Sequence, residues 1–220
     1  MKRVMEPELM EAPEQALAYA RADFAEVNQG FVDRVVTTFP EWRTGHMIDL
    51  GCGPADIPIR LARALPEIRI TAVDGSEAML GFARQAVAEA GLADRIRLLH
   101  ARVPNLPLPP HSFDAVISNS LLHHLREPPV FWSEVIRLGK LGAAVLIMDL
   151  FRPDSPERAR EIVEAAAANE APILKEDFLN SLLAAFTLEE VREQLRVSGL
   201  SHLRGEIVSE RHWLVWGRLL

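Results

Sequence analysis

Compact aliphatic runs alternate along the chain with longer segments in which apolar residues recur every three or four positions. The compact runs predict buried strands, because strands of a covered parallel sheet are almost continuously apolar. These predicted strands lie at 47–50, 68–73, 96–100, 113–118 and 143–150. The longer segments between them predict helices. Strands that alternate with helices in this way indicate an α/β chain built on a parallel sheet.

Two more helices are predicted ahead of the first strand, at 13–25 and 28–39, because their apolar residues keep helical spacing. We therefore expect residues 1–45 to form an N-terminal helical lid and residues 46–220 to form the main domain. Simple packing of these helices against the sheet edge is the alternative to a lid.

The segment after the fifth predicted strand departs from the alternation. Helices at 155–168 and 172–186 are expected to form a helical insertion that spans about 151–186. Thr187 and Glu190 then form a capping-box pattern that opens one further helix. The last predicted elements are two strands of an antiparallel hairpin, at 203–208 and 212–216.

Composition restricts the classes of function. The chain has 220 residues, enough for one domain with a sizeable core, and its net charge of -7 argues against a nucleic-acid surface. Cys52 is the single cysteine, which excludes an intramolecular disulfide and any multi-cysteine metal site. We expect a cytoplasmic protein with no membrane span. No H-x-x-x-H or H-E-x-x-H spacing occurs, so no metal site is expected.

A glycine turn between the first strand and the next helix is the strongest chemical signal. Asp49 is followed by Gly51, Cys52 and Gly53, and the helix starts near Asp56, which we expect to be its N-cap. A dinucleotide fingerprint would need glycine at position 56, and a phosphate-binding loop would need a G-K-[ST] sequence. A buried strand and turn without any ligand remains the alternative.

The acid two residues before the first glycine, D-x-G-x-G, resembles motif I of the class I S-adenosylmethionine (SAM) dependent methyltransferases. The sequence S-N-S-L-L-H-H-L at 118–125 is similar to the type-11 group that includes ubiquinone and menaquinone methyltransferases. Ala55 replaces the third glycine that this family often has. The resemblance implies a Rossmann-like, doubly wound, seven-stranded sheet with a terminal antiparallel hairpin. It also implies SAM as cofactor, S-adenosylhomocysteine (SAH) as product and a small-molecule acceptor.

The resemblance also implies cofactor contacts. Asp74, at the tip of the second strand, would accept hydrogen bonds from both ribose hydroxyls, unless it only caps the next helix. Met79 would cover the adenine. Arg102 stands where many members have an acid, so only backbone contacts from Arg102 and Val103 are expected at the base. The expected cofactor-binding residues are Asp49, Gly51, Cys52, Gly53, Asp74, Gly75, Met79, Arg102, Val103, Ser118 and Asn119.

The acceptor side is expected to combine helical residues with the histidine pair. Tyr19, Phe24 and Asn180 are the predicted substrate-pocket residues. His123 and His124 are the candidate catalytic residues; we expect one of them, preferably His124, to face the pocket and the other to pack or cap. Asp149 is expected to pair with Arg152, or else to serve as a second polar group in the pocket.

Methyl transfer from a sulfonium is an in-line displacement, so positioning supplies most of the rate. A general base is needed only when the acceptor must lose a proton, and an imidazole is suited to that role near neutral pH. The main alternative function is a SAM- or SAH-binding regulatory or structural module without catalysis. A nicotinamide-dependent reductase is disfavoured by Asp56 and by the terminal hairpin. The oligomeric state, including a homodimer, is left open.

Overall fold

A mixed β-sheet forms the centre of the computed structural model, which describes residues 1–6 and 12–220. In this described part the sheet has seven strands in the order β3-β2-β1-β4-β5-β7-β6. The strands are β1 (Thr44–Leu50), β2 (Glu67–Asp74), β3 (Ile96–His100), β4 (Phe113–Asn119), β5 (Gly139–Leu150), β6 (Arg204–Ser209) and β7 (His212–Arg218). Strands β1 to β5 pair in parallel, whereas β7 is antiparallel to both β5 and β6. The predicted fold class is therefore confirmed, including the terminal hairpin.

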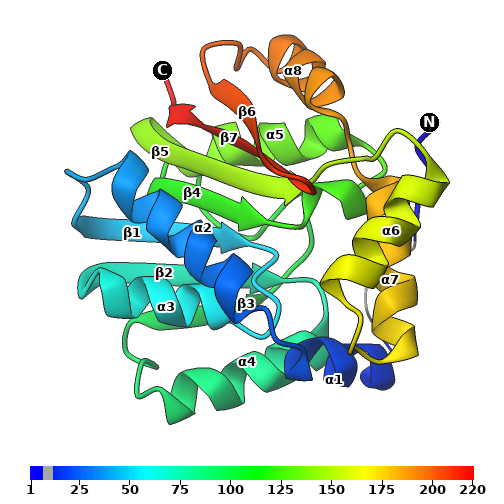
Figure 1. The fold of residues 1–220 in the computed structure, drawn as a ribbon. Helices are drawn as coiled ribbons and strands as arrows, with labels where there is room; N and C mark the ends of the chain where they lie inside the picture. Colours follow the sequence, from blue (N-terminus) through cyan, green and yellow to red (C-terminus); the bar gives the residue numbers. More distant parts are fainter. Residues whose placement is uncertain (7–11) are drawn as a thin grey trace.

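Helices cover both faces of the sheet (Figure 1). They are α1 (Pro13–Arg21), α2 (Ala25–Thr38), α3 (Asp56–Ala64), α4 (Glu77–Glu89), α5 (Pro128–Leu138), α6 (Pro156–Ala166), α7 (Pro172–Ala184) and α8 (Leu188–Val197), with a 3-10 turn η1 (Leu122–His124). Helices α2, α3 and α4 contribute to one core cluster, and α5 and α8 contribute to the cluster on the opposite face. None of the described helices has the length and hydrophobicity that a membrane-crossing segment needs.

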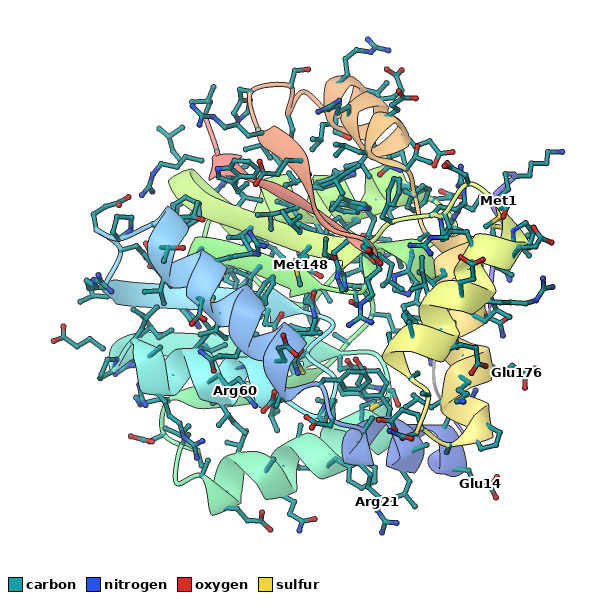
Figure 2. All side chains as sticks on the ribbon, viewed as in Figure 1. Met1, Glu14, Arg21, Arg60, Met148 and Glu176 are labelled. Carbon is teal, nitrogen blue, oxygen red and sulfur yellow. The ribbon has the colours of Figure 1, made fainter. Side chains whose placement is uncertain are left out.

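The alternation of side chains along each strand supplies both cores. On β5, Leu146 and Met148 pack with α2 and α3, whereas Val145 and Ile147 pack on the α5 side. Figure 2 shows Met148 in the middle of the molecule, while Glu14 and Glu176 lie at the outer edge of the helical end. Both faces of the sheet are therefore buried, as the continuous apolar strands predict.

Two expectations need correction. Helix α1 ends at Arg21, because the Asp23 side chain accepts the Ala25 N–H and starts α2 there. Strand β5 begins at Gly139 rather than 143, since Gly139 already pairs with Phe113 ahead of a register shift between Phe113 and Ala115.

The first six residues form an N-terminal strap (residues 1–6) that lies against α7 and η1. Val4 donates its N–H to the Leu183 carbonyl at 3.0 Å. The Arg3 guanidinium donates to the carbonyls of Ala184, His123 and Leu125 at 2.5, 2.7 and 3.0 Å. These contacts join the start of the chain to the carboxyl edge of the sheet, where the helical insertion α6–α7 also lies (Figure 1).

Candidate active site

The turn after β1 is built from positive-φ residues and backbone hydrogen bonds. Gly51 and Cys52 donate their N–H groups to the Val73 carbonyl at 2.8 and 2.9 Å, which ties the turn to β2. Gly51 has φ +79°, and a Cβ there would lie 3.0 Å from the Leu121 side chain. Glycine is therefore required at position 51 by conformation and by space.

Ala55 occupies the N-cap position of α3 with φ 67° and ψ 24°, the left-handed region. This conformation explains why glycine suits the position and why Ala55 is a departure with a conformational cost. Asp56 was expected to cap the helix but is its first residue, and no side-chain cap is present. Its carboxylate instead accepts from Arg60 at 2.7 Å and from Asn28 at 2.9 Å, which links α3 to α2.

Asp74 connects the glycine turn to the start of α4. One carboxylate oxygen accepts the Gly53 N–H and the other accepts the Ser76 N–H, each at 2.8 Å. The cap of α4 is Ser76, whose side chain accepts from the Met79 N–H, so Asp74 is not the capping residue. Burial raises the pKa of Asp74, although the hydrogen bonds from Ser76 and Gly53 oppose that shift.

Asp49 lies beneath the turn and is 2% exposed. Burial, with a further contribution from the negative charge of Asp74, raises the pKa of Asp49 to about 8. Two acids, Asp49 and Asp74, therefore lie next to the glycine turn, and both would be stabilised in their ionised form by a positive charge nearby.

A cavity of about 700 Å³ opens between the glycine turn, η1 and helices α1, α6 and α7. Such a volume suits a small organic ligand. The predicted residues that line it are Tyr19, Phe24, Gly51, Cys52, Gly53, Asp74, Met79, Asn119, His123 and His124. The predicted residues outside its lining are Asp49, Gly75, Arg102, Val103, Ser118 and Asn180. One cavity therefore joins most of the expected cofactor side to the expected acceptor side.

The predicted residues outside the lining have other surroundings. Ser118 is fully buried and donates to the Leu50 carbonyl at 2.6 Å, so it holds β4 to β1. Asn180 was expected in the substrate pocket, but the lining face of α7 carries Asp177, Phe178 and Ser181. Residues 177 and 181 are one helical turn apart, which places Asn180 on a different face of the helix.

The two histidines converge rather than diverge. Their ring centroids lie 4.1 Å apart, so the expectation that neighbouring histidines on one turn must face different ways is wrong. Nδ1 of His124 lies 3.0 Å from a Glu6 carboxylate oxygen, and Nε2 of His123 lies 3.4 Å from the same atom. The N-terminal strap thus brings Glu6 to the histidine pair.

Asp149 pairs with His123 and not with Arg152. Its carboxylate accepts from His123 Nδ1 at 2.5 Å and from the His123 backbone N–H at 3.2 Å. Arg152 instead pairs with Glu190 at 2.7 Å. Burial alone would raise the pKa of Asp149, but the charge and hydrogen bond of His123 lower it below its usual value. Burial likewise opposes protonation of His123, and Asp149 raises the pKa of His123 overall.

Sequence reasoning missed Glu6 and Ser181. The Ser181 hydroxyl donates to the Glu6 carboxylate at 3.1 and 3.3 Å. No local pattern marks Glu6, because it reaches the histidines through the fold of the strap. The His123–Asp149 pair had a detectable signal: β4 and β5 are parallel neighbours, so the residues at their carboxyl ends must meet.

Comparison with known proteins agrees with this geometry. Residues 47–142, which include the glycine turn, Asp74 and the histidine pair, match the family described as "Methyltransferase domain". The chain carries a class I SAM-dependent methyltransferase domain. The solved structure of a SAM-dependent methyltransferase from Aquifex aeolicus superposes with a TM-score of 0.71 at 19% identity, covering 95% of this chain and 99% of that one. That likeness supports the fold of the domain.

Curated relatives of the methyltransferase domain are moderately similar. The 27-O-demethylrifamycin SV methyltransferase of Amycolatopsis mediterranei is 26% identical over 86% of this chain and 66% of the relative. A demethylmenaquinone methyltransferase of Lactiplantibacillus plantarum is 32% identical over 50% of this chain and 47% of the relative. The chain thus spans less than two thirds of the length of these relatives.

SAM is the cofactor of this class, and the residues of the cavity fit it. The buried oxygen Oδ1 of Asn119 lines the cavity without a hydrogen-bond partner among the described residues, so it is available to a donor such as an ammonium group. The raised pKa values of Asp49 and Asp74 likewise favour a cationic ligand over a phosphate. Asp74, Asn119 and the turn at Gly51–Gly53 are therefore the residues that would hold SAM.

Proposed function

We propose that the chain transfers the methyl group of SAM to a small, partly apolar acceptor bound in the cavity of about 700 Å³. The observation that carries this proposal is the continuity of that cavity. It is lined at one end by the glycine turn and Asp74, and at the other by the histidine pair and α7. A donor held at the first end and an acceptor held at the second would meet within one continuous cavity.

SAM supplies an electrophilic methyl group when it is bound. The role of the protein is to hold the two reactants in line and to keep water out, and this positioning accounts for most of the rate in such displacements. We assign the cofactor to the glycine turn and to Asp74. We assign the acceptor to the space beside α7, where Phe178 provides aromatic surface. The rings of Tyr19 and Phe24 pack on each other, with centroids 4.7 Å apart, and Tyr19 lies next to Gly53, so this pair borders the acceptor space from the side of the glycine turn.

The polar end of the acceptor space is His124. Its side chain is 16% exposed, whereas that of His123 is 2% exposed and engaged with Asp149. In this proposal His124 accepts the proton when the acceptor is a hydroxyl or a protonated amine, and His123 with Asp149 holds it in place. The relatives named for rifamycin and menaquinone precursors support a small acceptor of mixed polarity.

Calorimetric titration with SAM, SAH and NADH tests the proposal first. We expect SAM and SAH to bind with one site per chain and NADH to give no signal. Absence of SAM binding would overturn the proposal. SAM binding with no turnover of any phenol, quinol, amine or thiol acceptor would instead support a non-catalytic SAM- or SAH-binding module.

The substitution His124→Ala tests the assignment of the acceptor end. We expect turnover to fall by roughly 10²- to 10⁴-fold, the usual contribution of a general base, with SAM affinity changed by less than about threefold. His100→Ala is the matched control, because His100 is an exposed histidine that contacts Glu77 away from the cavity. Equal losses of turnover and SAM affinity in His124→Ala would indicate a structural histidine.

A further inference from the structure

We propose that Glu6, His123 and His124 form a binding site for one divalent transition-metal ion of the zinc type. Each residue offers one ligand atom, and the three atoms lie within 4.8 Å of one another. The sequence spacing predicts no metal site, since the histidines are adjacent and the carboxylate comes from the N-terminal strap. The site is a product of the fold and involves no multi-residue motif.

The two separations from the Glu6 oxygen suit a single ion, and the two imidazole nitrogens lie within 4.8 Å of each other. The Glu6 oxygen lies 3.0 Å from His124 Nδ1 and 3.4 Å from His123 Nε2. Ligand bonds to zinc of about 2.0–2.2 Å at tetrahedral or octahedral angles place neighbouring ligand atoms roughly 3.0–3.5 Å apart. An ion could therefore bind Glu6 and both imidazoles with little rearrangement.

The two imidazole nitrogens that face Glu6 are available for ligation. His123 Nε2 and His124 Nδ1 are both buried and have no hydrogen-bond partner among the described residues. The side chain of His123 is 2% exposed, so its free nitrogen has no access to bulk water either. A buried nitrogen without a partner is costly, and a metal bond would satisfy both nitrogens at once.

The surroundings orient these ligands as metal sites usually do. The Asp149 carboxylate accepts from Nδ1 of His123, which fixes the tautomer whose Nε2 carries the free lone pair. The Ser181 hydroxyl donates to the Glu6 carboxylate. Arg3 belongs to the same strap, and its guanidinium is already engaged with backbone carbonyls and with the Phe186 ring, 4.0 Å from the ring centroid.

The donor set selects the class of ion. Two imidazoles and one carboxylate suit zinc and its neighbours in the first transition row, whereas magnesium and calcium prefer all-oxygen sites. Three protein ligands leave a coordination position open, and both histidines line the cavity, so that position would face the acceptor space. Ligation would occupy the lone pair that the proposed function assigns to proton acceptance, so the metal and the base are alternative uses of His124. The metal site itself does not depend on methyl transfer.

The test is metal binding by the full chain without an affinity tag and without SAM. Zn²⁺ is titrated in competition with a chromophoric chelator, and Co²⁺ is added separately to record its visible absorption. We expect one Zn²⁺ per chain and a Co²⁺ spectrum of a low-coordinate nitrogen and oxygen site. Glu6→Gln and His124→Ala should each lower Zn²⁺ affinity at least tenfold, and Asp149→Asn should lower it about 10- to 100-fold.

Glu6→His separates a metal site from a simple ion pair. The variant replaces the carboxylate by a third imidazole, which is also a good zinc ligand, so binding should stay within about tenfold of the parent. An ion pair between Glu6 and protonated histidines would give no stoichiometric Zn²⁺ binding in any variant. Thermal unfolding of each variant without metal confirms that the strap is still in place.

Two controls address adventitious binding. His100→Ala removes an exposed histidine beside Glu77, and Glu89→Gln removes a carboxylate from another part of the same cavity, where it is bonded to Gln85. Neither should change Zn²⁺ affinity. The proposal is overturned if Zn²⁺ fails to bind stoichiometrically, if Glu6→Gln binds as tightly as the parent, or if His100→Ala loses as much affinity as His124→Ala. SAM binding is measured separately, so a failure of the metal site leaves the proposed function untouched.

Discussion

Asp49 and Asp149 occupy equivalent positions on two strands, but their pKa values are shifted in opposite directions. Each is the penultimate residue of a parallel strand, in β1 and β5, and they are 2% and 1% exposed. Burial and the nearby Asp74 raise the pKa of Asp49 to about 8. Burial acts on Asp149 as well, but the His123 partner lowers the pKa of Asp149 below its usual value.

The difference separates the two ends of the cavity. At the proposed cofactor end, burial and the nearby Asp74 oppose ionisation of Asp49, so a cationic ligand would stabilise the ionised carboxylate. At the acceptor end the protein supplies its own compensation through His123. The stability contributed by the proposed cofactor end is therefore expected to change strongly with ligand binding and with pH. The stability contributed by the acceptor end is expected to depend on the pairing of Asp149 with His123.

The same substitution at both acids should have opposite effects on stability. Asp149→Asn leaves His123 without its buried partner, so the free energy of unfolding should fall by about 3 kcal/mol. Asp49→Asn removes an acid that the fold does not compensate, and the unliganded protein should keep or gain stability at pH 8. Chemical denaturation of both variants at that pH measures the difference. Equal destabilisation would show that the two sites are not electrostatically distinct.

Removal of Asp74 should give the next largest effect, on SAM affinity. We expect Asp74→Ala to weaken binding by roughly 1.5–3 kcal/mol, the scale of hydrogen bonds to a charged group. This is about 10- to 150-fold in the dissociation constant measured by calorimetry. Asp56→Ala is the matched control, because Asp56 is another carboxylate on the cavity wall that is paired with Arg60. An equal loss in the control would indicate a general charge effect and remove Asp74 from ribose recognition.

The glycine turn of the proposed cofactor end was largely predictable from sequence, because local patterns encode its backbone. Asp49 lies near the end of β1, Gly51 and Gly53 follow that strand, and Ser76 caps α4. Gly51 and Gly53 both have positive φ angles, a conformation that glycine adopts easily. The glycines in the sequence therefore indicate the turn directly.

The acceptor end was less predictable because tertiary packing assembles it. Glu6 lies on the strap, His123 follows β4 and Ser181 lies on α7, and no spacing along the chain relates them. Asn180 shows the same limit, since the helix was predicted correctly but its lining face was not. Arg152 was paired with Asp149 by proximity in sequence, whereas parallel neighbours in the sheet brought His123 there instead.

The pH dependence of unliganded stability offers a finer test of Asp49. Its folded pKa, about 8, exceeds the usual value of 3.8, so the folded chain retains a proton that the unfolded chain has lost between these values. The stability that Asp49 contributes is therefore complete below about pH 4 and is lost as the pH rises through 8. The expected slope between pH 6 and 8 is at most about 1.4 kcal/mol per pH unit.

Denaturation curves recorded between pH 6 and 8 measure that slope. Asp49→Asn is the control, and the difference between parent and variant isolates the contribution of Asp49 from those of other groups. A parent and variant with parallel pH profiles would contradict the raised pKa of Asp49.

The smallest effect is expected at Ala55, where opposing terms nearly cancel. Glycine would relieve a left-handed conformation that costs a side-chain residue about 1–2 kcal/mol. It would also remove a fully buried methyl group, worth about 0.8 kcal/mol, and add about 0.4–1 kcal/mol of unfolded-state entropy. Ala55→Gly should therefore change the free energy of unfolding by less than about 1 kcal/mol, measured by denaturation, with SAM affinity unchanged.

Gly53→Ala is the informative counterpart of Ala55→Gly. Gly53 has φ +52°, and an added Cβ would meet nothing closer than Tyr19 at 3.8 Å, so the substitution adds conformational strain without a clash. It should destabilise by about 0.5–1.5 kcal/mol, because the lower entropy of the unfolded chain offsets part of the conformational cost. If Ala55→Gly instead raised SAM affinity tenfold, the result would indicate that Ala55 holds the glycine turn in a conformation that binds SAM less tightly. A neutral result means that burial of its methyl group compensates for the missing glycine, so the departure from the family pattern leaves the cofactor end intact.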